Sequence, residues 1–318
     1  MNLRSLESLC KVVDCGLSIS DASDKLNRSQ PTVSRQIQEI ERDVGVKIFD
    51  RQRNRLLRLT REGEQIVEIA RRLLRDQQSL QRIGEDARHG NIGELTVATT
   101  HTQACYSLPP VVRNFMANYP QVNLTLRQGD PVQCHELVAQ GLADLAVCTE
   151  ARDPPDGVIF IPCFRLNRSI VTQKDHPLTR TGGLTLEKVS KYPLITYGEA
   201  FSGRDAMERA FASKGLTPKV VMSAVDADVS KAYVGFGLGI AILATIAFDP
   251  ARDTELKRLD ARHIIPSSAL GIVVPKASYL RQYMTDFIIG FAPHVTERRL
   301  RRILLDGKNI AVGDCPEI

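Results

Sequence analysis

The chain has 318 residues, of which 43% are hydrophobic and 25% are charged, and its formal net charge is +5. This length exceeds one ordinary domain, and the composition is typical of a globular protein rather than a disordered or fibrous one. The positive charge is compatible with nucleic acid but is too small to establish it. No segment resembles a signal peptide or reaches the ~18 apolar residues of a membrane span, so we expect a cytoplasmic protein without membrane contact.

Three short helices are predicted at the N-terminus from apolar residues at helical spacing. They cover residues 3–13, 21–26 and 31–44. Ser29 suits the N-cap of the third helix, and Pro31 suits its first turn, where a missing N–H costs nothing. A helix, a tight polar break and a second helix form the arrangement that reads the major groove of DNA.

The third helix has amide, hydroxyl and arginine side chains on the faces that its apolar stripe leaves free. The contact residues expected there are Gln30, Pro31, Thr32, Ser34, Arg35 and Gln38. Gln30, Ser34 and Arg35 are the candidates for base edges, because Gln suits adenine and Arg suits guanine. The alternative is an ordinary surface helix that contacts no DNA.

A two-stranded hairpin is predicted for residues 46–60, directly after this helix. Arg51, Arg53 and Arg55 recur at strand spacing near its tip, as a wing that lies along a phosphate backbone requires. The window from residue 28 to residue 61 holds nine basic and four acidic residues. This segment therefore contains a local positive charge that the whole chain does not show.

A long helix is predicted from about residue 61 to residue 88, with Thr60 as its N-cap. It would be about 40 Å long at 1.5 Å per residue. We expect a helix of this length beside a small domain to pair with a second subunit.

From residue 94 onward, apolar strands alternate with helical patterns, which favours parallel-rich α/β layers. About 200 residues suffice for two small α/β lobes with a cleft between them. The expected domains are a winged helix-turn-helix at 1–60, a linker helix and hinge at 61–92, and an α/β domain at 93–318. Its first lobe would take about 93–163 and 267–295, and its second lobe about 164–266.

Polar residues follow several predicted strands, where ligands of open α/β folds bind. Thr100, Thr102 and Gln103 lie between a strand and a helical pattern, where hydroxyls, an amide and free N–H groups favour a small anion. Further candidates for the same cleft are Gln128, Thr149, Ser202 and Arg204. The alternative is that these hydroxyls simply cap helices.

Catalytic and metal chemistry find little support in the sequence. The seven cysteines are scattered singly, which argues against a disulfide framework or a structural zinc site. His101 has no nucleophile beside it by motif, so it is interpreted as a structural or pocket-lining residue. Cys105 is interpreted as a buried, inert thiol rather than a redox sensor, because no resolving cysteine follows it.

The whole pattern resembles the LysR-type transcriptional regulators. The resemblance rests on SQPTVSRQIQEIE, on VKIFDR and on the long helix, and it covers nearly all of residues 1–295. Within the family, TTHTQA, FSGR and DADVSKAYV resemble the CysB/Cbl branch that controls sulfur assimilation. The resemblance implies a winged helix-turn-helix, a dimerising linker helix, two periplasmic-binding-protein-like subdomains, and assembly as a homodimer or homotetramer.

The resemblance also implies roles for matching positions. Thr100, Thr102 and Gln103 match the anion-binding loop of the branch, Thr149 matches another ligand position, and Ser202 stands where a threonine is usual. Known effectors of the branch include sulfate, thiosulfate, acetylated serine and an activated sulfate nucleotide. The chain departs from the pattern at Cys105, where Arg is usual, and at Leu166, where an aromatic residue is usual.

The leading hypothesis is a regulator, not an enzyme, that binds promoter DNA and activates sulfur-assimilation genes in response to a small anionic or sulfur-related effector. No cofactor or metal is expected, and RNA polymerase is a further candidate partner. One alternative is a LysR-type regulator of organosulfur or sulfonate use, or of another pathway, with an altered pocket. Others are an enzyme on a binding-protein fold, which would need an activated nucleophile or a metal cluster, and an architectural DNA protein that senses nothing.

Overall fold

The computed structural model describes residues 1–52, 55–89, 92–276, 279–306 and 310–318, with the backbone alone at 55, 78, 82 and 85–89. The chain divides into two compact units, residues 1–88 and 89–318. None of the helices in these described ranges combines the length and the apolar character needed to cross a bilayer.

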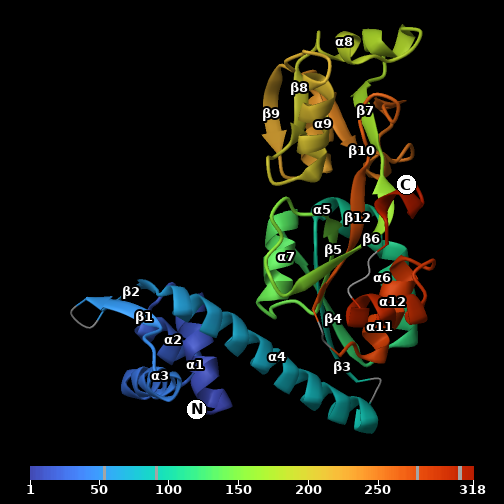
Figure 1. Ribbon diagram of the computed structural model, residues 1–318. Helices are drawn as coiled ribbons and strands as arrows, with labels where there is room; N and C mark the ends of the chain where they lie inside the picture. Colours follow the sequence, from blue (N-terminus) through green and yellow to red (C-terminus); the bar gives the residue numbers. More distant parts are fainter. Residues whose placement is uncertain (53–54, 90–91, 277–278, 307–309) are drawn as a thin grey trace. The chain divides into compact units, whose positions relative to one another are not determined.

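The first unit is a winged helix-turn-helix, as predicted. Its elements, blue to teal in Figure 1, are α1 (Leu3–Asp14), α2 (Ile19–Lys25), α3 (Gln30–Val44), β1 (Phe49–Gln52), β2 (Arg55–Leu59) and the start of α4 (Arg61–His89). β1 and β2 pair antiparallel and form the wing. Apolar side chains of α1 and α3 share one core with Phe49 of the wing and with Val67 and Ala70 of α4.

Local sequence sets the limits of these helices. The Ser29 side chain accepts a hydrogen bond from a backbone N–H in the first turn of α3 (3.3 Å), and Gly45 ends that helix in the left-handed conformation with φ 75°. The hydroxyl of Thr60 accepts from the N–H of Gly63 (2.9 Å), which confirms Thr60 as the cap of α4. A Cβ at Gly63 would lie 2.1 Å from the carbonyl oxygen of Ile48, so only glycine lets α4 start this close to the wing.

In the second unit, the described strands form two five-stranded sheets. The first sheet has the order β4-β3-β5-β12-β6, and the second has the order β11-β7-β10-β8-β9. The strands of the first sheet are β3 (Gly93–Thr99), β4 (Val122–Gln128), β5 (Leu145–Thr149), β6 (Val158–Leu166) and β12 (Ser268–Pro275). Those of the second are β7 (Arg168–Gln173), β8 (Leu194–Tyr197), β9 (Val220–Ala224), β10 (Ile240–Ala244) and β11 (Leu256–Asp260).

Helices cover both sheets (Figure 1). With the first sheet lie α5 (His101–Tyr106), α6 (Leu108–Asn118), α7 (Pro131–Ala139), α11 (Gln282–Phe291) and α12 (Glu297–Asp306). With the second lie α8 (Leu186–Val189), α9 (Ser202–Ala212) and α10 (Ala227–Gly235). Short 3-10 turns occupy 177–180, 245–247 and 312–314. Each sheet with its helices has its own apolar core, so the unit consists of two lobes.

The sheets are mixed, although the alternating pattern had indicated largely parallel layers. β4, β3 and β5 are parallel, whereas β12 pairs antiparallel with both β5 and β6. In the second sheet β8 is parallel to β9 and β10, and β7 is antiparallel to β10 and β11. The antiparallel strands are those by which the chain passes directly between lobes, where no helical crossover intervenes to make neighbours parallel.

The passage from β6 to β7 places two side chains between the lobes. β6 ends at Leu166 and β7 begins at Arg168, so Asn167 alone joins a strand of one sheet to a strand of the other. Both flanking residues are buried. The short connection therefore fixes Leu166 and Arg168 at the boundary of the two lobes.

Candidate DNA interface and effector pocket

The leading edge of α3 is open to solvent. Gln30, Pro31, Thr32, Arg35 and Gln38 are exposed and Ser34 is half-buried. The Arg35 side chain is 80% exposed, and it forms an ion pair of 3.4 Å with Glu39 on the same helix. Because exposed ion pairs of this kind are weak, Arg35 is available to contact a base edge.

The opposite face of α3 fixes the helix in the unit. Val33, Ile37 and Ile40 are buried in the core. The Ser8 hydroxyl of α1 donates a hydrogen bond to the Gln36 side chain (2.6 Å). These contacts hold the polar edge at a defined orientation, which groove recognition needs.

The wing arginines are not equivalent. Arg51 pairs with Glu41 at 3.2 Å, and the Glu41 side chain is 3% exposed. The same carboxylate accepts the Ile48 N–H (3.0 Å) and an ion pair from Lys47 (3.4 Å). Arg51 therefore helps to fasten the wing to α3. Arg53 lies outside the described residues, and the side chain of Arg55 is not described, so their expected phosphate contacts stay predictions.

An open groove lies between α3 and the wing. Its lining residues are Gln38, Glu41, Arg42, Gly45, Val46, Lys47 and Arg51. Arg42 and Lys47 are exposed cations beside Gln38 that the motif-based analysis did not select. Their place could have been found from helical spacing, since Arg42 lies four residues after Gln38 and so on the same face.

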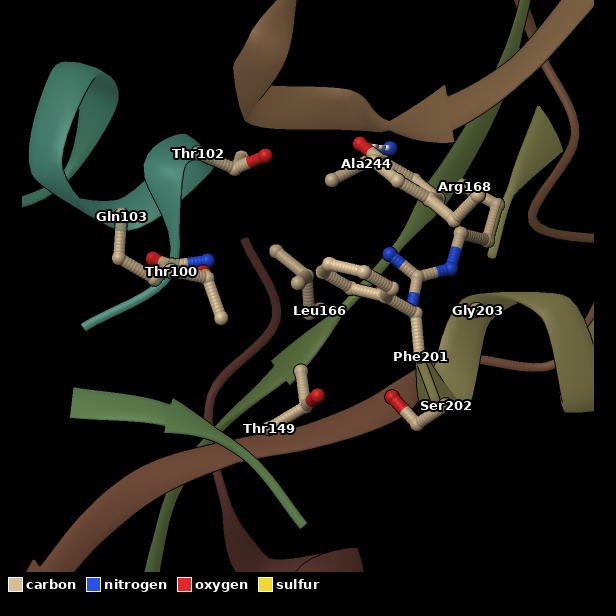
Figure 2. Close-up of a pocket in the computed structure, with 11 residues that line it drawn as sticks. Thr100, Thr102, Gln103, Thr149, Leu166, Arg168, Phe201, Ser202, Gly203 and Ala244 are labelled. Carbon is tan, nitrogen blue, oxygen red and sulfur yellow. Dashed lines mark hydrogen bonds between the residues drawn. The ribbon is translucent and has the colours of Figure 1, made fainter. Parts of the chain in front are cut away.

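In the second unit a pocket lies between the lobes (Figure 2). Its lining residues are Thr100, Thr102, Gln103, Thr149, Leu166, Arg168, Tyr197, Phe201, Ser202, Gly203 and Ala244. Five of these were predicted from the sequence, namely Thr100, Thr102, Gln103, Thr149 and Ser202. The structure thus brings the loop after β3, the end of β5 and the start of α9 to one place, as the strand-end argument indicated.

Arg168 is the one charged residue among these lining residues. It is 2% exposed, and one guanidinium nitrogen donates to the Ser268 hydroxyl (2.7 Å). Nε is buried without a hydrogen-bond partner, and no carboxylate in the described part of the chain forms an ion pair with Arg168. Burial lowers the pKa of the Arg168 guanidinium, yet Arg stays protonated in proteins. The pocket therefore holds a desolvated positive charge.

Gly203 lets the guanidinium approach the start of α9. A Cβ at this position would lie 3.0 Å from Cζ of Arg168, closer than side chains normally pack. The neighbouring Ser202 hydroxyl is buried and has no hydrogen-bond partner among the described residues. The first turn of an 11-residue helix also presents backbone N–H groups and a partial positive charge here.

The hydroxyl of Thr100, between β3 and α5, does not serve as a cap. Thr100 occupies the N-cap of α5, but its side chain makes no capping hydrogen bond. It is 5% exposed and Thr102 is 7% exposed. The simple capping alternative therefore fails for Thr100. The side-chain carbonyl oxygen of Gln103 accepts a hydrogen bond from the Ser107 hydroxyl (2.7 Å).

Two predicted residues do not line the pocket. Gln128 is exposed at the end of β4, which is an edge strand of the first sheet. Arg204 turns away along α9, where it contacts Glu208 and donates to the Ser223 hydroxyl (3.4 Å). The charged pocket residue that the sequence analysis missed is Arg168.

The pocket is small and straddles the two lobes. Its volume is about 20 Å³, which is enough for a water molecule. Leu166 lines it, whereas Cys105 lies outside it. An anion larger than water therefore requires the lobes to part or the lining side chains to shift, and its occupancy must depend on the closure of the lobes.

Comparison with known proteins assigns both units. Residues 3–64 match the family profile "Bacterial regulatory helix-turn-helix protein, lysR family", and residues 88–291 match "LysR substrate binding domain". The chain is similar to the HTH-type transcriptional regulator SsuR of Burkholderia cenocepacia, with 39% identity over 96% of this chain and 99% of that protein. It is also similar to CysB of Haemophilus influenzae, with 38% identity over 93% of this chain and 91% of that protein.

A solved structure agrees with these matches. The crystal structure of the cofactor-binding domain of the Cbl transcriptional regulator superposes with a TM-score of 0.64 at 36% identity, covering 68% of this chain and 94% of that chain. The expected fold class is confirmed, with the helix-turn-helix first and the two-lobed α/β domain second.

Proposed function

The chain belongs to the LysR family of transcriptional regulators, and from this premise we propose that it activates sulfur-assimilation genes when a small sulfur-containing anion binds beside Arg168. Like its relatives, it is a DNA-binding transcriptional regulator and not an enzyme. The buried guanidinium of Arg168, which no carboxylate of the described residues pairs with, is the observation that supports the anionic effector most strongly.

The chemistry of the lining suits a fully ionised oxyanion. Arg168 supplies the charge, and Thr100, Thr102, Thr149 and Ser202 supply hydroxyls that can donate. No carboxylate occurs among the lining residues named above, so no group there repels an anion or requires it to bear a proton. Sulfate and thiosulfate match this set of donors, and so does the sulfuryl end of an activated sulfate nucleotide.

Binding at the lobe boundary provides the link to transcription. The threonines belong to the first lobe, whereas Arg168 and Ser202 belong to the second. An anion that contacts both groups binds one degree of closure better than another and shifts the equilibrium by that difference in affinity. We propose that this shift changes the arrangement of the subunits on DNA.

On the DNA side, Gln30, Ser34 and Arg35 are proposed to contact base edges, with Pro31, Thr32 and Gln38 beside them. Arg42 and Lys47 are added as phosphate contacts, because they are exposed beside Gln38 in the groove between α3 and the wing. Arg51 is proposed to act mainly by holding the wing, given its ion pair with buried Glu41.

The apolar face of α4 supports a dimer. Ile69, Leu73, Leu80 and Ile83 are between 38% and 72% exposed, at spacings of three, four and seven residues that place most of them on one stripe. We propose that this stripe pairs with α4 of a second subunit, and that dimers associate into a homotetramer. We further propose that the DNA-bound protein contacts RNA polymerase and that it acts in the cytoplasm. The proposed function uses no cofactor.

Leu166 favours a second candidate function within the same family. It lies in the pocket, where its branched aliphatic side chain leaves a different shape from the aromatic residue usual in the resembling branch. An effector with an apolar part, such as an organic sulfonate, would fit beside it. In that case the chain would regulate organosulfur or sulfonate use.

Calorimetry on the full-length protein tests the proposal. Sulfate, thiosulfate, acetylserine, adenylyl sulfate and a short-chain alkyl sulfonate are titrated in sulfate-free buffer, and promoter DNA is footprinted with and without each compound. Binding of an inorganic sulfur anion with a changed footprint is the expected result. Binding of the sulfonate alone would support the second candidate, and binding of none of them would refute both.

A further inference from the structure

A second cluster of reactive side chains lies outside the pocket. His101 and Cys105 belong to α5 of the first lobe, and Asp228 belongs to the first turn of α10 in the second. One imidazole nitrogen, the thiol sulfur and one carboxylate oxygen all lie within 4.8 Å of one another. These three groups are typical ligands of zinc and related metals.

The spacing within α5 fits a shared metal ion. His101 and Cys105 are four residues apart and so lie on the same face of the helix. Nε2 of His101 lies 3.5 Å from Sγ of Cys105. In a tetrahedral zinc site with Zn–S of about 2.3 Å and Zn–N of about 2.05 Å, these two atoms would be about 3.6 Å apart. The pair therefore already has the separation of two ligands on one ion.

Asp228 provides an oxygen on the same side. Its Oδ2 lies 3.8 Å from Nδ1 of His101, whereas Oδ1 accepts a hydrogen bond from the Tyr106 hydroxyl (2.5 Å). That bond to Tyr106 fixes the carboxylate, as hydrogen bonds of the outer shell do in known metal sites. Nδ1 of His101 is buried and has no hydrogen-bond partner among the described residues. Because an imidazole gives one nitrogen to an ion, the ring would have to rotate until that nitrogen faces both Sγ of Cys105 and the carboxylate of Asp228.

The nearby charges permit a divalent cation. Lys231 lies close to Asp228, with Nζ 3.0 Å from Oδ1, but it also pairs at 3.0 Å with Asp253. With Cys105 as thiolate, the negative groups are this thiolate and the carboxylates of Asp228 and Asp253, and the positive group is the ammonium of Lys231. A divalent ion balances the excess of negative charge. His101 and Cys105 are half-buried and Asp228 is exposed, so an ion can reach the cluster from solvent.

We propose that His101, Cys105 and Asp228 form a three-ligand site for a divalent transition metal, with Zn²⁺ as the best match and water in the fourth position. A thiolate together with an imidazole selects zinc over the hard cations Mg²⁺ and Ca²⁺. Because the ligands come from both lobes, a bound ion would hold α5 against α10. The ion would be an input to lobe closure separate from the anion at Arg168.

Cobalt spectroscopy on the full-length protein tests the site. Co²⁺ is added to the reduced wild-type protein and to three variants, Cys105→Ser, Asp228→Asn and His101→Gln. A thiolate ligand gives a sulfur-to-cobalt charge-transfer band in the near ultraviolet that nitrogen and oxygen ligands do not give. Cys15→Ser is the matched control, since Cys15 is also half-buried but lies in the first unit.

The expected result is one Co²⁺ per chain with the band in the wild type and in Cys15→Ser, and no band in Cys105→Ser. Competition with Zn²⁺ should show at least a 100-fold loss of affinity in each ligand variant, since even outer-shell changes cost 10–100-fold. Zn²⁺ should raise the melting temperature of the wild type and not that of Asp228→Asn. A missing band in the wild type, a band that persists in Cys105→Ser, or an equal thermal shift in Asp228→Asn overturns the proposal.

Discussion

Replacing Arg168 with methionine separates a ligand role from a structural role. Methionine keeps most of the length and apolar volume of the stem and removes the charge. In the protein without effector, the change deletes one hydrogen bond to Ser268 (2.7 Å), worth about 1.5–3 kcal/mol for a charged donor. It also removes a buried charge whose desolvation costs several kcal/mol and which no carboxylate of the described residues offsets. We therefore expect the free energy of unfolding to fall by no more than about 1 kcal/mol.

The effect on anion binding should be much larger. Truncating one partner of a buried, hydrogen-bonded charge pair costs about 2–5 kcal/mol, which is about 30-fold to about 4000-fold in affinity. Calorimetry with sulfate and thiosulfate measures this loss, and urea unfolding of the same samples measures stability. Arg204→Met is the matched control, because Arg204 lies outside the pocket and pairs with Glu208.

Two outcomes would refute this reasoning. Anion affinity within threefold of the wild type would mean that Arg168 does not contact the effector. A loss of more than about 3 kcal/mol in the free energy of unfolding would mean that the guanidinium stabilises the fold as a partner of a buried pair does. Arg204→Met should leave the anion affinity unchanged. A large loss of affinity in that variant alone would place the effector beside Arg204, as the sequence analysis expected.

Three further changes test other parts of the structure. Gly203→Ala should weaken sulfate binding about tenfold in calorimetry, or about 1.4 kcal/mol, because its Cβ would lie 3.0 Å from the Arg168 guanidinium, whereas Gly198→Ala, with nothing within 4 Å, should bind normally. Glu41→Gln should lower the free energy of unfolding of the first unit by about 2 kcal/mol and weaken DNA binding in gel-shift assays, because it removes a buried charge that holds the wing; unchanged stability would contradict this. Burial lowers the pKa of His135, so its neutral form stabilises the fold above its ordinary pKa of 6.5 and that stability is lost as the pH falls below it. His135→Phe should therefore lose less stability than the wild type between pH 7 and pH 5 in urea unfolding, and equal losses would contradict the assignment.

Much of the fold could be predicted because local chemistry decides it. Ser29 and Thr60 were identifiable as caps, and both accept the expected backbone hydrogen bonds. The long α4 followed from one apolar stripe. β11 and the six-residue α5 were missed, because a short edge strand such as LKRLD and a single helical turn or two have no clear periodicity.

The candidate site was predicted only in part, because strand ends fix a position but not a direction. Thr149 ends β5 and Ser202 begins α9, and both line the pocket, while Gln128 ends an edge strand and is exposed. Arg168 was missed because it stands next to the first apolar residues of a strand. In sequence, an arginine there is usually at an exposed end. Arg168 is buried because β7 lies between two other strands of the second sheet and because the first lobe covers the beginning of β7. No local sequence pattern reveals either fact.

The position of α5 connects the two proposed inputs. Its N-terminal side supplies Thr102 to the pocket that contains Arg168, while Cys105 and Tyr106 at its other end face Asp228 of the second lobe. An effector that binds Thr102 and Arg168 together must hold the lobes at one separation, and the contacts of α5 with α10 respond to the same separation. A desolvated guanidinium makes this coupling strong, because its pairing with an anion is worth more in a buried pocket than in water. In this proposal a bound anion adds free energy to closure, and this dependence is what a sensor of a small anion requires.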